Sequence, residues 1–177
     1  METKIQLLPL LEEHTIAMKE EMQDAFQHGF QAYQKDDGEK DSNHWQVLPD
    51  EDFYRSLRAE GAEAYEAVDD DGQRLGGAII TVNDESREGE LAFLYVKVGV
   101  QSRGIGQAIW KAIETLHPEV EVWETCTPYF DRRNIHFYIN RCGFHAIEFF
   151  NEHHPDPHMP EQFDQEDGLF VFEKRMK

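Results

Sequence analysis

Cysteines, long apolar runs and basic residues are all scarce in this sequence of 177 residues, and each scarcity excludes a class of protein. The two cysteines, Cys126 and Cys142, each lie in an apolar stretch, which favours reduced packing thiols over a disulfide. No apolar run approaches the roughly 18 residues of a membrane-spanning helix, and the first residues, METKIQLLPLLEEH, lack the basic start and apolar block of a signal peptide. We therefore expect a soluble, cytoplasmic protein with no membrane partner.

The scarcity of basic residues gives the chain a strongly acidic balance. It has 36 acidic and 17 basic residues, and its formal net charge is −19. Such a surface repels nucleic acid and anionic lipid, so we expect neither as a partner. The segment 97–141 differs, because its six basic and five acidic residues give a net charge of +1 and leave −20 for the rest of the chain. The lower negative charge of this segment favours an anion site there, although so short a segment could also differ from the rest by chance.

The segment 91–116 has the pattern of a strand, a turn with glycines and a helix. Residues 91–98 are a short run of apolar, aromatic and β-branched residues, which predicts a buried strand. Apolar residues then recur at helical spacing over 105–116. The first amides of a helix lack intrahelical acceptors and lie at the positive end of its dipole, so the turn with Gly104 and Gly106 suits a phosphate. A strand–helix connection without a ligand can have the same pattern, and this turn matches neither the Walker loop nor the dinucleotide fingerprint.

This turn and a later segment together resemble a known family. Gln101-x-x-Gly104-x-Gly106, which follows the strand residues Leu94-Tyr95-Val96, resembles the acetyl-CoA loop of the GNAT superfamily of N-acetyltransferases. About thirty residues later, NIHFYINRCGF at 134–144 is similar to the family's short helix that carries a Phe-Tyr pair and ends in Gly-Phe. Because both motifs stand in the family's order and spacing, the sequence is identified as a member of this superfamily.

The resemblance implies a mixed α/β fold of the GNAT type, the acyl-CoA N-acyltransferase fold, in which helices flank a central, mostly antiparallel mixed sheet. The length and the 40 % apolar content suit one domain, so we expect a single N-acetyltransferase domain over residues 1–177. Residue patterns predict the order β α α β β β α β α β β, with Pro9 ending the first strand and a loop over 34–49. The expected helices are 11–33, 50–58, 105–116 and 131–140, and the expected strands are 4–8, 62–68, 74–82, 91–98, 120–126, 144–150 and 169–174. Asp131 is expected to cap the last of these helices, and Gly143 is expected to end it.

The resemblance also implies a reaction, the direct attack of an amine on the thioester of acetyl-CoA, the co-substrate. An alkyl amine is mostly protonated at neutral pH, so the reaction needs a base, a donor for the oxyanion and an acid for the departing thiolate. Glu90 resembles the strand-borne glutamate that acts as the base, although a solvated carboxylate here, or a water chain in its place, stays open. Tyr138 resembles the tyrosine that acts as the acid. It precedes Gly143 by five residues instead of the usual four, so either the helix carries an extra residue or Ile139 takes the usual place.

The expected cofactor-binding residues come from three places. The backbone of the central strand would pair with pantetheine at Tyr95, Val96 and Val98. Asn134 resembles the asparagine that contacts the cofactor, although it sits nearer the tyrosine than usual and could be a plain residue of the first helical turn. The loop would hold the pyrophosphate through the amides of Gln101, Ser102, Arg103, Gly104, Ile105, Gly106 and Gln107.

The expected acceptor is a primary amine of a small molecule or a peptide. The acidic balance would suit a cationic acceptor such as a polyamine, an aminoglycoside or a lysine side chain. Trp45 could be a lid over the acceptor pocket or a packed residue of its loop. Dimers are frequent in the family, so a homodimer is compatible with the resemblance. A non-catalytic module of the same fold that senses acyl-CoA is the alternative function.

No metal site is expected. His153, His154 and His158 stand in the tract HHPDPH, a polar and proline-rich loop, whereas zinc ligands usually stand on rigid elements with a second shell of hydrogen bonds. The tract is expected to be a solvated surface loop or a wall of the acceptor site.

Overall fold

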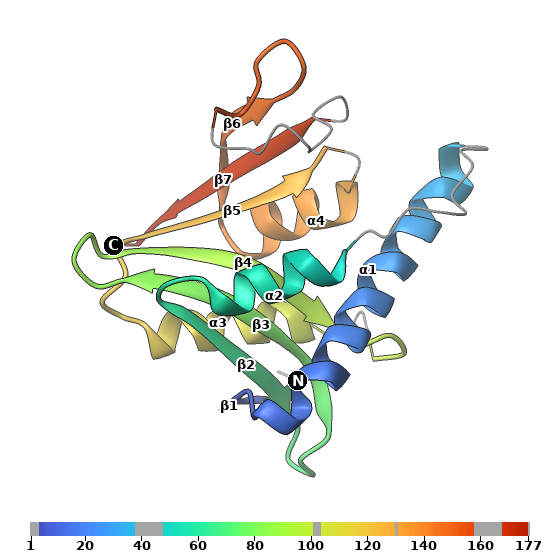
Figure 1. The fold of residues 1–177 in the computed structure, drawn as a ribbon, viewed down its shortest axis with the longest axis vertical. Helices are drawn as coiled ribbons and strands as arrows, with labels where there is room; N and C mark the ends of the chain where they lie inside the picture. The colour runs from blue at the N-terminus through green and yellow to red at the C-terminus, as the bar shows by residue number, and fades with distance from the viewer. Residues whose placement is uncertain (1–3, 38–47, 101–103, 130, 158–167, 177) are drawn as a thin grey trace.

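The computed structural model describes residues 4–37, 48–100, 104–129, 131–157 and 168–176. The strands in this part of the chain are β1 (Gln6–Pro9), β2 (Ala62–Val68), β3 (Arg74–Asn83), β4 (Glu88–Val96), β5 (Val122–Pro128), β6 (His145–Phe150) and β7 (Leu169–Arg175). They form one seven-stranded sheet in the order β1-β2-β3-β4-β5-β7-β6 (Figure 1). Neighbouring strands are antiparallel except β4 and β5, which are parallel. The predicted mixed and mostly antiparallel sheet is therefore confirmed.

Helices lie on both faces of this sheet (Figure 1). The helices α1 (Thr15–Asp37) and α2 (Asp50–Arg58) lie on one face, and α3 (Ile105–Leu116) and α4 (Arg132–His136) lie on the other. A 3-10 turn, η1 (Glu12–His14), precedes α1, and a π-helical turn, η2 (Phe137–Arg141), continues α4. None of the helices that the structure describes is long and apolar enough to cross a membrane.

The sheet separates two apolar cores. The core on the α3 side contains Trp110 of α3 and Trp123 of β5, whose rings meet edge to face at 5.2 Å. The core on the α1 and α2 side contains Met18, Met22 and Phe53. Burial alternates along β5, because successive side chains of a strand point to opposite faces of the sheet. The two helical layers thus bury both faces of the central strands.

The pair β4 and β5 opens the sheet at one end. Their parallel ladder contains the register pairs Glu88–Val122, Gly89–Trp123 and Glu90–Glu124. Beyond this short ladder the two strands diverge towards their C-terminal ends (Figure 1). A β-bulge at Ala92 in β4 lies just past the last pair. The register pairs between β4 and β5 therefore end at Glu90, two residues before the bulge.

The predicted order of strands and helices is confirmed, but several boundaries differ. β1 includes Pro9, which an edge strand tolerates because one side of it makes no ladder bonds. α1 continues to Asp37, so the first residues of the predicted loop are helical. β4 begins at Glu88 and ends at Val96, because its first residues pair with β5 and the chain turns where the amide of Val100 bonds the carbonyl of Lys97.

Candidate active site

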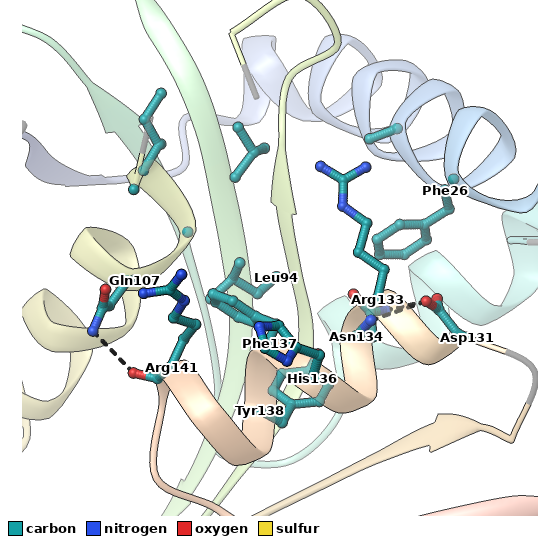
Figure 2. Close-up of a pocket in the computed structure, with 16 residues that line it drawn as sticks. Phe26, Leu94, Gln107, Asp131, Arg133, Asn134, His136, Phe137, Tyr138 and Arg141 are labelled. Atoms are coloured by element: carbon teal, nitrogen blue, oxygen red, sulfur yellow. Dashed lines mark hydrogen bonds between the residues drawn. The ribbon is translucent and has the colours of Figure 1, made fainter. Parts of the chain in front are cut away.

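A cleft of about 530 Å³ lies between the second half of β4, the start of α3 and the α4–η2 segment, with α1 along one side (Figure 2). Its floor includes Leu94 and Val96 of β4. It lies at the end of the sheet where β4 and β5 have parted. The residues from the helices and their ends are Ala25, Phe26, Gly29, Gly104, Ile105, Gly106, Gln107, Asp131, Arg133, Asn134, His136, Phe137, Tyr138 and Arg141.

The start of α3 brings backbone donors to one end of this cleft. Gly104, the N-cap residue, has a φ of 73°, a left-handed conformation that favours glycine. A Cβ at Gly106 would lie 3.1 Å from the ring of Phe137, so a larger residue here would press that ring away from α3. No side chain among the described residues caps this helix, so its first amides are free to bind an anion.

Two arginines of the α4–η2 segment add positive charge to the cleft. Figure 2 shows Arg141 extending towards the start of α3 and Arg133 extending towards α1. Neither guanidinium group forms a salt bridge with a described residue. The side-chain amide of Gln107 donates to the carbonyl of Arg141 at 3.0 Å and ties α3 to η2. The cleft is therefore locally positive although the chain is strongly acidic.

The π-helical turn accounts for the unusual position of Tyr138. The amide of Cys142 donates to the carbonyl of Phe137, five residues earlier, at 3.0 Å. This wide turn accommodates one extra residue before Gly143, which ends the segment with a φ of 84°. Tyr138 is 6 % exposed and lines the cleft, whereas Ile139 is 38 % exposed. Of the two alternatives that the spacing left open, the structure has the helix with the extra residue.

Tyr138 is held by aromatic packing and stays protonated. Its ring meets Phe144 edge to face at 5.8 Å and lies 5.9 Å from Phe172 of β7. Burial raises the pKa of its hydroxyl above the ordinary value, so the phenol carries its proton at neutral pH. A protonated hydroxyl in a cleft can donate that proton to a leaving group.

Glu90 lies at the last β4–β5 pair, on the sheet face that α1 and α2 occupy. Its register partner is Glu124, and the register partner of Glu124 on β7 is Glu173. The three carboxylates thus form a row across three neighbouring strands. Desolvation raises the pKa of Glu90, and desolvation together with the charge of Glu90 raises the pKa of Glu124. Glu90 is therefore a better proton acceptor than an ordinary glutamate.

Comparison with known proteins shows which family has this arrangement. Residues 15–144 match the Acetyltransferase (GNAT) family. The chain belongs to the GNAT family of acetyltransferases. It is 42 % identical over 138 residues to the uncharacterized protein YrkN of Bacillus subtilis (strain 168), and the match covers 74 % of each chain.

Solved structures of GNAT proteins share the fold. One is the ribosomal-protein-S18-alanine N-acetyltransferase from Escherichia coli, with a TM-score of 0.66, 15 % identity and coverage of 97 % of this chain and 94 % of that one. Another is a Bacillus subtilis acetyltransferase in complex with CoA, with a TM-score of 0.65, 16 % identity and coverage of 99 % and 100 %. At these identities the likeness concerns the fold alone.

The structure brings together most, but not all, of the residues that GNAT resemblance singles out. Tyr138, Val96, Gly104, Ile105, Gly106, Gln107 and Asn134 line the cleft. Gln101, Ser102 and Arg103 lie outside the described residues. Asn134 donates its side-chain amide to Asp131 at 2.9 Å, and its backbone amide bonds the same carboxylate, which caps α4 as the sequence predicts.

Three other GNAT site predictions fall outside the cleft lining. The side chain of Tyr95 points to α1, where its hydroxyl donates to Glu21 at 2.8 Å, so only its backbone is available to a cofactor. Val98 lies in the turn after β4 and is 40 % exposed, because the chain leaves the sheet after Val96. Glu90 lies at the last register pair of β4 and β5, where the strands begin to diverge, and on the sheet face opposite α3.

Several residues of this GNAT cleft were missed in the sequence. Arg133, Arg141 and Phe26 line it, and so does Asp131, which the sequence marks only as a cap. The sequence did contain a pattern that could have predicted Arg141. Residues 134, 137, 138 and 141 follow the i, i+3, i+4, i+7 spacing of one helical face, so if Tyr138 faces the cleft, Arg141 should face it too.

His153, His154 and the two cysteines are not among the residues that line the cleft. His154 bonds Glu148 at 2.7 Å, and His158 lies outside the described residues. Within the described ranges, no group of three histidine, cysteine or acidic side chains suits a metal ion.

Both cysteines are free thiols, and Cys142 is buried as expected. The packing expectation for Cys126 is wrong, because it follows Glu124 on the exposed side of β5. Trp45 lies outside the described residues.

Proposed function

We propose that this protein is an acetyl-CoA-dependent N-acetyltransferase that moves an acetyl group to a primary amine of a small molecule or a peptide. The observation that carries the proposal is the cleft, which joins an uncapped helix start and two arginines to a protonated tyrosine beside the parting strands. The first amides of α3 and the guanidinium group of Arg141 suit the phosphates of coenzyme A. The edge of β4 from Ala92 to Tyr95, which lies beyond the last register pair with β5, suits the amides of pantetheine.

Acetyl-CoA supplies an activated thioester, and the residues of the chain provide the remaining chemistry. Glu90 takes the proton of the acceptor ammonium, directly or through a water molecule, and the free amine attacks the carbonyl carbon. A backbone N–H of β4 between Ala92 and Tyr95 bonds the oxyanion of the tetrahedral intermediate. Tyr138 gives its proton to the thiolate as the carbon–sulfur bond breaks, and the extra proton on the attacking nitrogen is released as the amide forms and restores the phenol.

The acceptor in this proposal is cationic. Glu90, Glu124 and Glu173 lie in one cross-strand row on the face opposite α3, next to the point where the strands part. Among the described residues neither Glu90 nor Glu124 forms a salt bridge, whereas Glu173 binds Arg175 at 2.7 Å. A row of this kind attracts an amine that carries further positive charges and raises its local concentration.

The test is a calorimetric titration of the full chain with acetyl-CoA, followed by thiol release against a panel of mono-, di- and polyamines. The proposal expects saturable one-site binding and release that depends on the amine. Glu90→Gln and Tyr138→Phe should lower turnover while the affinity for acetyl-CoA stays unchanged, and Glu85→Gln, in the exposed turn before β4, serves as the control. Binding without release with every amine would instead favour an acyl-CoA-binding sensor. No binding at low salt would refute both functions.

A further inference from the structure

Thr125 of β5 is a polar residue in an otherwise apolar setting. It is only 2 % exposed and lies on the α3 side of the sheet, between Trp123 and Thr127. Its hydroxyl donates to the carbonyl of Leu91 on β4 at 2.8 Å. Burying a hydroxyl costs free energy unless it is hydrogen-bonded, and the bond to Leu91 offsets that cost. Valine would fill the same space without any such cost, so the hydroxyl itself needs an explanation.

This bond stands where the ladder between β4 and β5 ends. The last register pair is Glu90–Glu124, and Leu91 and Thr125 are the next residues on the two strands. The side-chain hydroxyl of Thr125 thus joins the strands one residue beyond their last backbone pair. It fixes the peptide group that follows Glu90, and the bulge at Ala92 begins directly after it.

Thr125 also lies beside the ring against which Tyr138 packs. Thr125 pairs in register with Phe172 of β7, and the ring of Tyr138 lies 5.9 Å from the ring of Phe172, on the same face of the sheet. The strand segment next to Glu90 and the packing of Tyr138 therefore meet at Thr125.

We propose that Thr125 is a positioning residue for the acyl transfer. One buried hydroxyl fixes the strand segment that carries Glu90, beside the ring against which Tyr138 packs, so it sets where the base lies relative to the acid. The inference rests on the proposed function and on the roles given there to Glu90 and Tyr138. Removing the hydroxyl deletes the bond to the carbonyl of Leu91 and lets the segment with Glu90 shift, while the helix start that suits the phosphates is untouched.

The test compares Thr125→Val, which keeps the shape and loses the hydroxyl, with Thr125→Ser, which keeps the hydroxyl. Thr127→Val is the matched control, because Thr127 is 3 % exposed, lies on the same face of β5 and does not line the cleft. Steady-state thiol release gives kcat and the KM for acetyl-CoA, and calorimetry gives the Kd for coenzyme A. Thermal melting verifies that each variant folds, and Thr125→Ala replaces the valine variant if that one does not.

We expect Thr125→Val to lower kcat by roughly tenfold or more and to leave the Kd for coenzyme A within about twofold of wild type. Thr125→Ser should restore kcat, and Thr127→Val should not change it. The double variant of Thr125→Val with Glu90→Gln should lose little more than Glu90→Gln alone, because Thr125 acts by positioning Glu90.

A Thr125→Val variant with unchanged kcat in an active enzyme would overturn this inference and leave the proposed function standing. Equal losses of kcat and of coenzyme A affinity, or additive losses in the double variant, would also overturn it, because they indicate a purely structural role. A wild-type chain that releases no thiol with any amine would refute the proposed function itself.

Discussion

Removing one carboxylate from the Glu90–Glu124 pair should make the protein more stable at neutral pH while it lowers activity. The two residues face each other on neighbouring parallel strands, which lie about 5 Å apart. No described cation lies in salt-bridge contact with either, so the pair repels. Glu90→Gln and Glu124→Gln keep the shape and remove the charge.

The expected gain follows from the distance and the exposure of the pair. Two unit charges about 5 Å apart in water repel by about 1 kcal/mol, and salt and side-chain motion reduce this for exposed groups. Each substitution should therefore raise the free energy of unfolding by about 0.5 kcal/mol, or the midpoint of thermal unfolding by roughly 1–2 °C. The double variant should gain little beyond either single variant, because each single change already removes the repulsion.

The gain should depend on pH in a defined direction. The folded protein raises the pKa of both carboxyl groups, through desolvation and, for Glu124, through the charge of Glu90 as well. A carboxyl with a raised pKa contributes stability below its unfolded pKa, and this contribution is lost as the pH rises through the folded pKa. The advantage of the variants should thus be largest at neutral pH and vanish towards about pH 4, where both groups are protonated in wild type.

Urea unfolding of wild type, both single variants and the double variant between neutral and acidic pH measures this effect. Glu85→Gln is the control, because Glu85 is exposed in the turn between β3 and β4. A loss of stability in either single variant at neutral pH would refute the reasoning. Gains that simply add in the double variant would refute repulsion between the two carboxylates as the cause, since desolvation acts on each carboxyl separately.

Three further substitutions test the geometry around the cleft. Gly89→Ala places a Cβ 2.5 Å from the buried ring of Trp123, so we expect a loss of about 1–3 kcal/mol in urea unfolding, and an unchanged midpoint would contradict the β4–β5 register. Gly104→Ala meets open space but must keep a φ of 73°, so it should cost about 1 kcal/mol; equal stability in the same assay would argue against the left-handed turn. Arg141→Ala should weaken coenzyme A binding by roughly fivefold at low salt in calorimetry and flatten its salt dependence, while Arg132→Ala, outside the cleft, should do neither.

The parts of this protein that could be predicted from the sequence are those that depend on neighbouring residues. The helix 105–116 was predicted with its observed ends, because its apolar residues recur at helical spacing and Gly104 precedes them. The cap at Asp131 and the stop at Gly143 were predicted for the same reason. Local patterns of this kind also predicted the order of the strands and helices and indicated the GNAT family.

Only the tertiary structure decided which distant residues meet. The pairing of Glu90 with Glu124, and the bond of Thr125 to Leu91, depend on the register between strands that a helix separates in the chain. The spacing of Tyr138 left two arrangements open, and packing against Phe144 and Phe172 selected the π-helical turn. The reason is physical: local preferences choose a helix or a strand, whereas burial of apolar side chains from remote segments chooses the register and the side that faces the cleft.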